Sequence, residues 1–219
     1  MYEHFNNAYS RHNDSFGGAN PFLCHPDEVK YRQYGALVAD ELAEKELVHA
    51  GTPVEVDLKG HSAKFMKLWE VVKVEAADSN SVITLNANWL APKLVATDVV
   101  MVVPADIKGT GKAVAAGTVT DNEDGTVSIT VATSSIGSVA AGDFLSIAEA
   151  AGSGKALKVK ANMVLTRDLR AGNAQNFVDV PRGELYCYVN TCNGIPAAVI
   201  ASAREIGLII EPEYFAEVG

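Results

Sequence analysis

The sequence predicts a mainly β protein with minor α content: a β-sandwich or barrel-like core, a small accessory β lobe and an extended N-terminal arm. Three observations favour this class. Valine and threonine alternate with small residues through Gly111–Ala148, and a charged turn at Asn122–Gly125 interrupts that run. Other alternating segments flank this stretch, whereas Pro196–Glu205 is the one segment with clear helix signals. Residues 1–26 follow neither a helical nor a strand period.

The composition is that of a folded protein with an acidic surface. The 219 residues are 48% hydrophobic and 21% charged, and the formal net charge is −9. An acidic surface disfavours binding to nucleic acid or anionic lipid, and no basic patch offsets it. No apolar run reaches the roughly 18 residues that span a bilayer. The first residues lack the basic and apolar regions of a signal peptide, so we expect synthesis in the cytoplasm without export.

Residues 1–26 form a segment with its own composition, rich in Asn, His, Ser and Gly. Two interpretations compete: a disordered tail, or an arm that becomes ordered when it docks on a partner. Solvating tails are poor in aromatic residues, and five aromatic side chains occur here, which favours the arm. The predicted anchor residues are Tyr2, Phe5, Tyr9, Phe16 and Phe22.

The next segment mixes weak helix and strand signals. Asp27 and Glu28 follow a proline and resemble the first turn of a helix, which Gly35 is expected to interrupt. His49–Val54 contains a Gly-Thr-Pro turn. A strand should follow it, with one face formed by Val54, Val56 and Leu58.

From residue 64 onward the pattern is mainly β. Lys67–Glu75 and Ser81–Leu85 are predicted to form a hairpin closed by the turn at Asp78–Asn80. The apolar run Val99–Val103 is typical of a strand buried on both faces. A second hairpin is expected from Lys112–Thr120 and Thr126–Ala132, on either side of the charged turn.

The last third is predicted to contain strands, one helix and polar connections. A Gly-Asp turn leads into a strand within Ala141–Ile147, and Ala151–Lys155 is expected to be a flexible connection. Strands are predicted at Leu157–Thr166 and Gly183–Asn190, separated by a polar loop at Asp168–Asn176. The helix Pro196–Glu205 should end at Gly207 and be followed by a short apolar segment.

These elements predict a domain organisation of three parts. Residues 1–26 are the arm, residues 27–104 and 151–219 form the core with its C-terminal helix, and residues 105–150 form the accessory lobe.

The chemistry-bearing motifs favour structure over catalysis, and we predict no catalytic residue, no metal and no cofactor. Asp121, Glu123 and Asp124 lie at a predicted hairpin tip, where solvent prevents the pKa tuning that paired catalytic carboxylates need. Glu46 and His49 form a single Glu-x-x-His, without the second copy that a bundle metal site requires. The Gly-Lys segments at residues 109–112 and 152–156 lack the spacing of a phosphate loop.

The cysteines and tryptophans leave two questions open. Cys187 and Cys192 are either buried thiols or a bridge across a tight turn, and Cys24 makes the count odd. Trp69 is expected in the core, whereas Trp89 is either core or a platform on which a sugar ring stacks.

Several segments together resemble the head proteins of tailed bacteriophages. Tyr34–Ala39 (YGALVA) with Val48–Val54 (VHAGTPV) is similar to the opening of capsid decoration and head-fibre proteins. Ala161–Leu169 (ANMVLTRDL) with Asn176–Leu185 (NFVDVPRGEL) resembles a later pair of strands in the same group. The closing Ile195–Glu211 is similar to their terminal helix and strand. The arm and the lobe fit a head-fibre or auxiliary capsid protein better than a compact decoration protein.

This resemblance implies a structural virion protein rather than an enzyme. It implies a homotrimer on the outer surface of the capsid, with the major capsid protein as its partner and the arm as its anchor. Two alternatives from other classes remain: a carbohydrate-binding adhesin that contacts a host-surface glycan through Trp89 and the lobe loops, and a glycan hydrolase that uses carboxylates near Asp121–Asp124.

Overall fold

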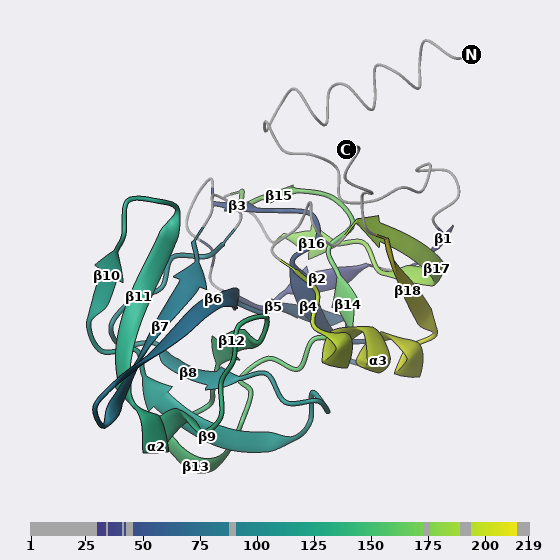
Figure 1. Cartoon of the computed structure of the whole chain (residues 1–219). Helices are drawn as coiled ribbons and strands as arrows, with labels where there is room; N and C mark the ends of the chain where they lie inside the picture. The colour runs from purple at the N-terminus through teal and green to yellow at the C-terminus, as the bar shows by residue number, and fades with distance from the viewer. Residues whose placement is uncertain are drawn as a thin grey trace, which may run out of the picture.

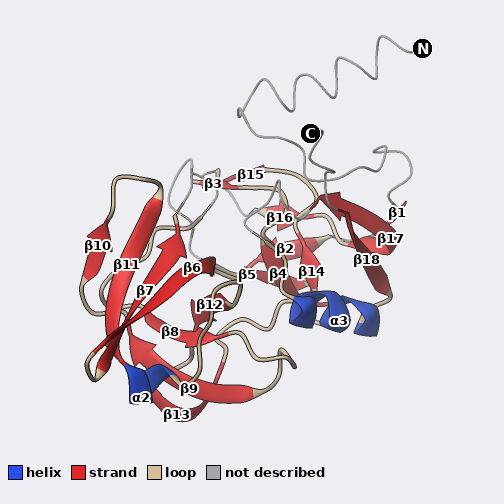
Figure 2. Cartoon of the chain, viewed as in Figure 1, coloured by secondary structure: helices blue, strands red, loops and turns tan. Residues whose placement is uncertain are grey.

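The computed structural model describes residues 30–33, 35–40, 42, 46–87, 91–172, 176–188 and 194–213. Within these ranges the chain is mostly β-strand, with two helices (Figures 1 and 2). The prediction of a mainly β fold with minor helix is confirmed. The arm, residues 1–26, lies outside the described residues.

The largest element is an eight-stranded antiparallel sheet in the order β10-β11-β7-β6-β12-β8-β9-β13. It curls into a half-barrel (Figure 1). A short helix, α2 (Thr133–Ile136), follows β11. The strands are β6 (Leu68–Ala77), β7 (Asn80–Asn86), β8 (Val99–Val102), β9 (Thr110–Ala115), β10 (Val119–Asp121), β11 (Thr126–Ala132), β12 (Phe144–Ile147) and β13 (Gly152–Ala156).

Three smaller sheets lie beside the half-barrel. A five-stranded sheet has the order β14-β4-β5-β2-β16, a three-stranded sheet the order β1-β17-β18, and a two-stranded sheet pairs β15 with β3. Helix α3 (Ala197–Glu205) connects the parallel strands β17 and β18. The strands are β1 (Lys30–Tyr31), β2 (Ala36–Val38), β3 (Leu47–Val48), β4 (Pro53–Asp57), β5 (Ser62–Phe65), β14 (Met163–Val164), β15 (Leu169–Arg170), β16 (Phe177–Val178), β17 (Pro181–Tyr188) and β18 (Leu208–Glu213).

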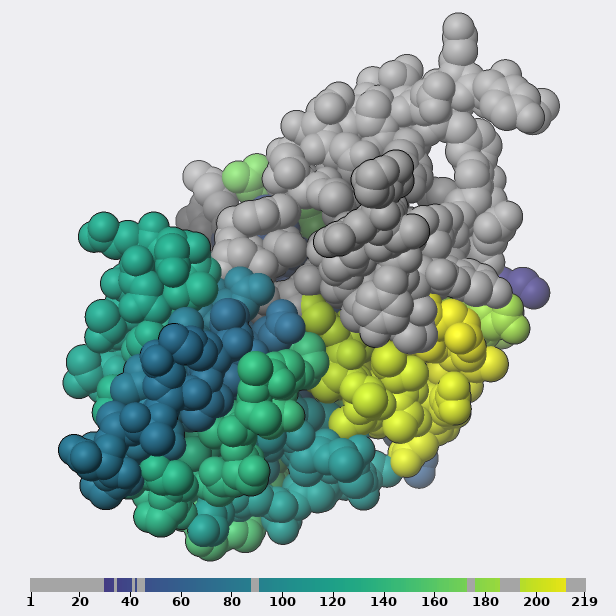
Figure 3. Space-filling view, in the orientation of Figure 1, coloured from purple at the N-terminus to yellow at the C-terminus, as the bar shows by residue number. Residues whose placement is uncertain are grey.

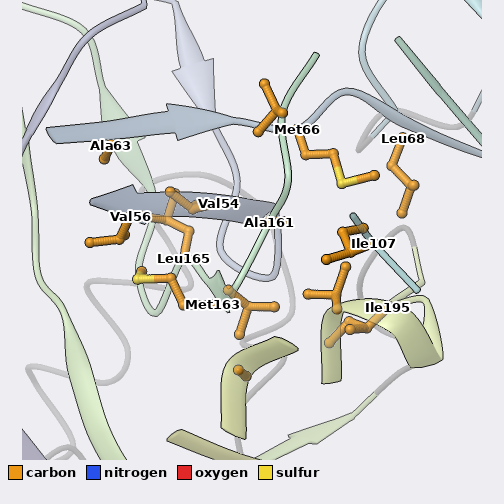
Figure 4. Packing of buried hydrophobic residues seen from close by; sticks show 14 of the residues in the cluster. Val54, Val56, Ala63, Met66, Leu68, Ile107, Ala161, Met163, Leu165 and Ile195 are labelled. Atoms are coloured by element: carbon orange, nitrogen blue, oxygen red, sulfur yellow. The ribbon is translucent and has the colours of Figure 1, made fainter. Parts of the chain in front are cut away.

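The buried apolar side chains form two clusters. The half-barrel core contains Trp69, Ile83, Leu85, Ile129 and Leu145, with further residues from β8, α2 and the neighbouring loops. The central core lies among the five-stranded sheet, the three-stranded sheet and α3, and Figure 4 shows part of it. Its labelled members, which turn toward one another from several segments, are Val54, Val56, Ala63, Met66, Leu68, Ile107, Ala161, Met163, Leu165 and Ile195.

Several predicted elements are confirmed. The first hairpin forms from β6 and β7, and Asp78 takes a positive φ of 53° in its turn. Val100 and Met101 of β8 are both fully buried, so this strand has two apolar faces as expected. The predicted helix is α3, and Gly207 follows its end with a φ of 76°. Trp69 is fully buried, and its indole Nε1 donates a hydrogen bond to the Pro92 carbonyl oxygen.

The second hairpin is smaller than predicted. Lys112–Thr120 is two strands, because β9 pairs with β8 and β13, whereas only β10 pairs with β11. The break lies at Gly117, which has a φ of 65° and donates its N–H to the Ala96 carbonyl oxygen. Contact with a distant loop therefore ends β9 in a run whose composition is uniformly strand-like.

Other expectations also need correction. Ala151–Lys155 is not a free connection, since β13 pairs with β9 across an irregular register in which Gly152 and Gly154 take positive φ. The predicted strand Leu157–Thr166 is reduced to β14 and one isolated bridge from Leu157 to Ala148. After the predicted helix start at residues 27–28, which lies outside the described residues, the chain forms short strands that pair with distant segments. Leu58 lies in the turn after β4.

The half-barrel sheet is continuous across the predicted lobe boundary. Strands from residues 105–150 pair with β6, β7 and β8 on one side of that range and with β13 on the other. The boundaries of the lobe and of the core stay a prediction.

We predict that Gly194→Ala destabilises the protein more than Gly207→Ala. Both glycines have positive φ, 83° and 76°, which costs a non-glycine residue about 1–2 kcal/mol. A Cβ at Gly194 would also lie 2.5 Å from Cε1 of Phe144, whereas one at Gly207 would meet no atom within 4 Å. Overpacking adds about 1–3 kcal/mol. Urea unfolding followed by circular dichroism measures the difference, and equal losses for the two variants would contradict it.

Candidate functional site

The five predicted anchor residues, Tyr2, Phe5, Tyr9, Phe16 and Phe22, lie outside the described residues. The structure does describe the point at which the chain continues from the arm. Here β1 pairs with β17, and the Arg32 N–H donates to the Val180 carbonyl oxygen at 2.8 Å. The Arg32 guanidinium also donates to the Ile206 carbonyl oxygen at 2.5 Å, beyond the end of α3. The root of the arm is thus joined to the three-stranded sheet and to α3.

A cation–π contact and an ion pair hold the same root. The Arg167 guanidinium carbon lies 5.6 Å from the centre of the Tyr31 ring, and Nη2 of Arg167 lies 2.5 Å from Oδ2 of Asp179. Both charged side chains are about half exposed. An exposed pair of this kind contributes little to stability, about 0–1 kcal/mol. The cation–π contact joins Arg167 to Tyr31 of β1, and the ion pair joins Arg167 to Asp179.

The hairpin tip lies far from this root: in Figure 1, β10 and β11 are at one end of the molecule and β1, β17 and β18 at the other. The space-filling view shows the same separation between the teal hairpin and the yellow C-terminal helix and strand (Figure 3). The turn residues Asp121–Gly125 are all exposed. Glu123 and Gly125 have positive φ, 61° and 81°, which closes a tight loop. The tip is a defined turn that projects into solvent.

Side-chain hydrogen bonds fix the backbone of the tip. Asp121 Oδ1 accepts from the Glu123 N–H at 2.9 Å, and Asp124 Oδ1 accepts from the Thr126 hydroxyl at 2.6 Å and from its N–H at 3.0 Å. The Asn122 amide nitrogen donates to the hydroxyl groups of Thr126 and Ser128. The three carboxylates considered for catalysis face solvent, and those of Asp121 and Asp124 hold the turn.

His49, the histidine of the single Glu-x-x-His in the sequence, lies near the carboxylate of Asp168. His49 Nδ1 is 3.8 Å from Oδ1 of Asp168, and the same oxygen accepts the Ala50 N–H at 2.8 Å. Asp168 therefore joins the loop around residue 168 to the start of the Gly-Thr turn. Among the described residues, no group of three or more His, Cys, Asp or Glu side chains could hold a metal ion. Trp89, Cys24 and Cys192 lie outside the described residues.

A cleft of about 590 Å³ lies where the half-barrel meets the smaller sheets. Its apolar lining includes Val48, Phe65, Met66, Pro92 and Ile147. Its charged and titratable lining consists of Asp40, Glu46, His49, Lys67, Lys93, Asp98 and Lys158. No sequence motif marks this site, because its residues come from segments far apart in the chain and share no spacing.

The carboxylates and the lysines of the cleft differ in their local partners. Asp40 Oδ2 accepts the Phe65 N–H at 2.6 Å, and Asp98 Oδ2 accepts the Val95 N–H at 3.0 Å. Within the described part of the chain, the ammonium groups of Lys67, Lys93 and Lys158 have no hydrogen bond or ion pair. The cleft therefore offers uncommitted cations beside an apolar surface.

Comparison with known proteins gave no match among family models, curated proteins or solved structures. In the described ranges, neither helix is long and apolar enough to span a membrane.

We predict that Thr126→Val raises the pKa of Asp124. The Thr126 hydroxyl, followed by backbone N–H groups, holds this pKa below its ordinary value of 3.8. Because the folded protein holds this pKa low, the ionised carboxylate stabilises the turn at pH values above its ordinary pKa. This stabilisation is lost as the pH falls through the lowered pKa. A carboxyl-detected NMR titration measures the shift. Thr130→Val, on the same strand, is the control, and an unchanged Asp124 pKa in Thr126→Val would contradict the prediction.

Proposed function

We propose that this protein is a structural virion component that binds the outer surface of a tailed-phage capsid as a head fibre or decoration protein. The arm, residues 1–26, is the capsid anchor and the major capsid protein is the partner. The β10–β11 hairpin points away from the capsid. In this proposal the protein acts as a displayed surface and not as an enzyme.

The observation that carries the proposal is that β1, where the described chain begins, and the exposed hairpin tip lie at opposite ends of the molecule. The arm joins the described chain at β1, and the last described strand, β18, belongs to the same three-stranded sheet. The exposed hairpin tip lies at the other end of the molecule (Figure 1). This arrangement suits a protein that is held at one end and presents the other to solvent.

Two further features support the proposal. The formal charge of −9 would keep a capsid-bound protein from competing for packaged DNA. The backbone of the tip is held by local hydrogen bonds from polar side chains. Such a turn tolerates full solvation at the particle surface.

Replacing the five arm aromatics Tyr2, Phe5, Tyr9, Phe16 and Phe22 by serine should reduce binding to particles of the cognate major capsid protein at least 100-fold. The reason is the loss of the apolar side chains that anchor the arm on docking. Co-sedimentation with the particles measures occupancy. The matched control replaces Asp121, Glu123 and Asp124 by asparagine at the tip and should bind normally. Full occupancy by the five-serine variant would refute the anchor.

The same proposal predicts a homotrimer in solution. Light scattering should give a mass near three times the chain mass of 23.2 kDa. A monomeric mass at concentrations that saturate the capsid would contradict the predicted trimer. The anchor would still be tested separately by the arm variant.

A further inference from the structure

A second cavity, of about 190 Å³, lies beside the root of the arm. Its wall combines residues that follow β1, the start of β2, the end of β4 with the turn after it, and the residue before β17. The charged and titratable side chains of this wall are Arg32, Asp57 and His61, of which His61 has an interaction of its own. The space is several times the roughly 30 Å³ that one water molecule occupies in the liquid, so a single water would not fill it.

Arg32 carries a buried hydrogen-bond donor that has no acceptor. Its Nη2 donates to the Ile206 carbonyl oxygen at 2.5 Å, but its Nε is shielded from solvent and has no hydrogen-bond partner among the described residues. A buried N–H group without a partner is costly, and such groups are rare in folded proteins. The Nε of Arg32 therefore needs an acceptor that the described part of the chain does not supply.

The carboxylate in the same wall is not paired with Arg32. Hydrogen bonds from the N–H groups of Gly60 and Lys59, the second at 2.9 Å to Oδ1, hold the pKa of Asp57 below its ordinary value of 3.8, so this side chain is ionised at neutral pH. A carboxylate has about four acceptor positions, and these two bonds leave some of them open. Among the described residues, neither Arg32 nor Asp57 forms an ion pair. Opposite charges that line one cavity without pairing leave room for a ligand that carries both.

The rest of the wall limits the kind of ligand further. Val56, Leu58 and Val180 contribute apolar surface, which suits a short aliphatic body. A dianion such as phosphate would be repelled by the carboxylate of Asp57. A simple carboxylate would satisfy Arg32 but would leave Asp57 facing a second negative charge. A small molecule with one carboxylate and one ammonium group avoids both conflicts.

We propose that this cavity binds a small aminocarboxylate, a zwitterion of about the size of a free amino acid. Its carboxylate accepts hydrogen bonds from the Arg32 guanidinium, including the one from Nε, and its ammonium group donates to the carboxylate of Asp57. Both are charge-assisted hydrogen bonds, and the pairing of a guanidinium with a carboxylate is favourable in a bidentate arrangement. This inference does not depend on the capsid role, and its test uses no capsid.

NMR titration of the full-length, ¹⁵N-labelled protein with L-alanine and with 4-aminobutyrate, at constant pH and ionic strength, tests the proposal. The probes differ in the distance between their charges, and each is compared with the acid and the amine that lack one charge: propionate and ethylammonium, or butyrate and propylammonium. We expect at least one zwitterion to shift the Nε–H resonance of Arg32 and the amides of Lys59 and Gly60, with a Kd about tenfold or more below those of its two analogues. Equal affinity for a zwitterion and its analogues, tighter binding of inorganic phosphate, or no shift with any probe would overturn the proposal.

Two conservative variants assign the two charges of the ligand to their partners. Asp57→Asn keeps a side-chain oxygen for the Lys59 N–H but removes the charge, so it should weaken the zwitterion about tenfold and leave the matching acid unaffected. Arg32→Lys keeps a cation that can donate to the Ile206 carbonyl oxygen but lacks Nε, so it should weaken the zwitterion and the acid alike. Arg170→Lys, at an exposed position of β15 outside this cavity, is the control and should change neither. Binding of the zwitterion with wild-type affinity by both Asp57→Asn and Arg32→Lys would overturn the proposal.

Discussion

The structure depends on strands that are buried on both faces, each face in a different core. In β6, Leu68 belongs to the central core and the next residue, Trp69, to the half-barrel core. In β8, Met101 belongs to the central core and Val100 to the half-barrel core. Because successive side chains of a strand point to opposite faces, a slip of one residue would exchange both sets. The two cores together therefore fix the register of the half-barrel more firmly than either core could alone.

This constraint also positions the parts that face solvent. The buried Ser146 hydroxyl donates to the Lys67 carbonyl oxygen at 2.7 Å and so joins β12 to the start of β6. The Trp69 indole holds the Pro92 carbonyl oxygen at 2.8 Å, which places the loop that carries Lys93. Two walls of the cleft are thus set by polar groups of the central strands. The cleft is a consequence of how the two cores meet.

The features that the sequence could predict are those made by neighbours in the chain. The alternation in Lys67–Glu75 and Ser81–Leu85 predicts β6 and β7 because the two strands pair across a short turn. The break at Gly117 could not be predicted, since its N–H partner, the Ala96 carbonyl, lies twenty-one positions earlier in the chain. The glycines at positions 152 and 154 predict a flexible connection. The local sequence does not reveal that β9 lies alongside and pairs with this segment. Pairing with a distant strand overrides local composition in each case.

The same distinction separates the two candidate surfaces. The hairpin tip is built from hydrogen bonds between residues two to six positions apart, so its charged turn could be predicted from the sequence. The cleft lysines lie at positions 67, 93 and 158 and have no common spacing. They meet because the link Met66–Lys67 joins β5 in the five-stranded sheet to β6 in the half-barrel, so that the two sheets approach each other at this point. A site that forms where two sheets join has no signature in the sequence, and only the path of the chain between the sheets reveals it.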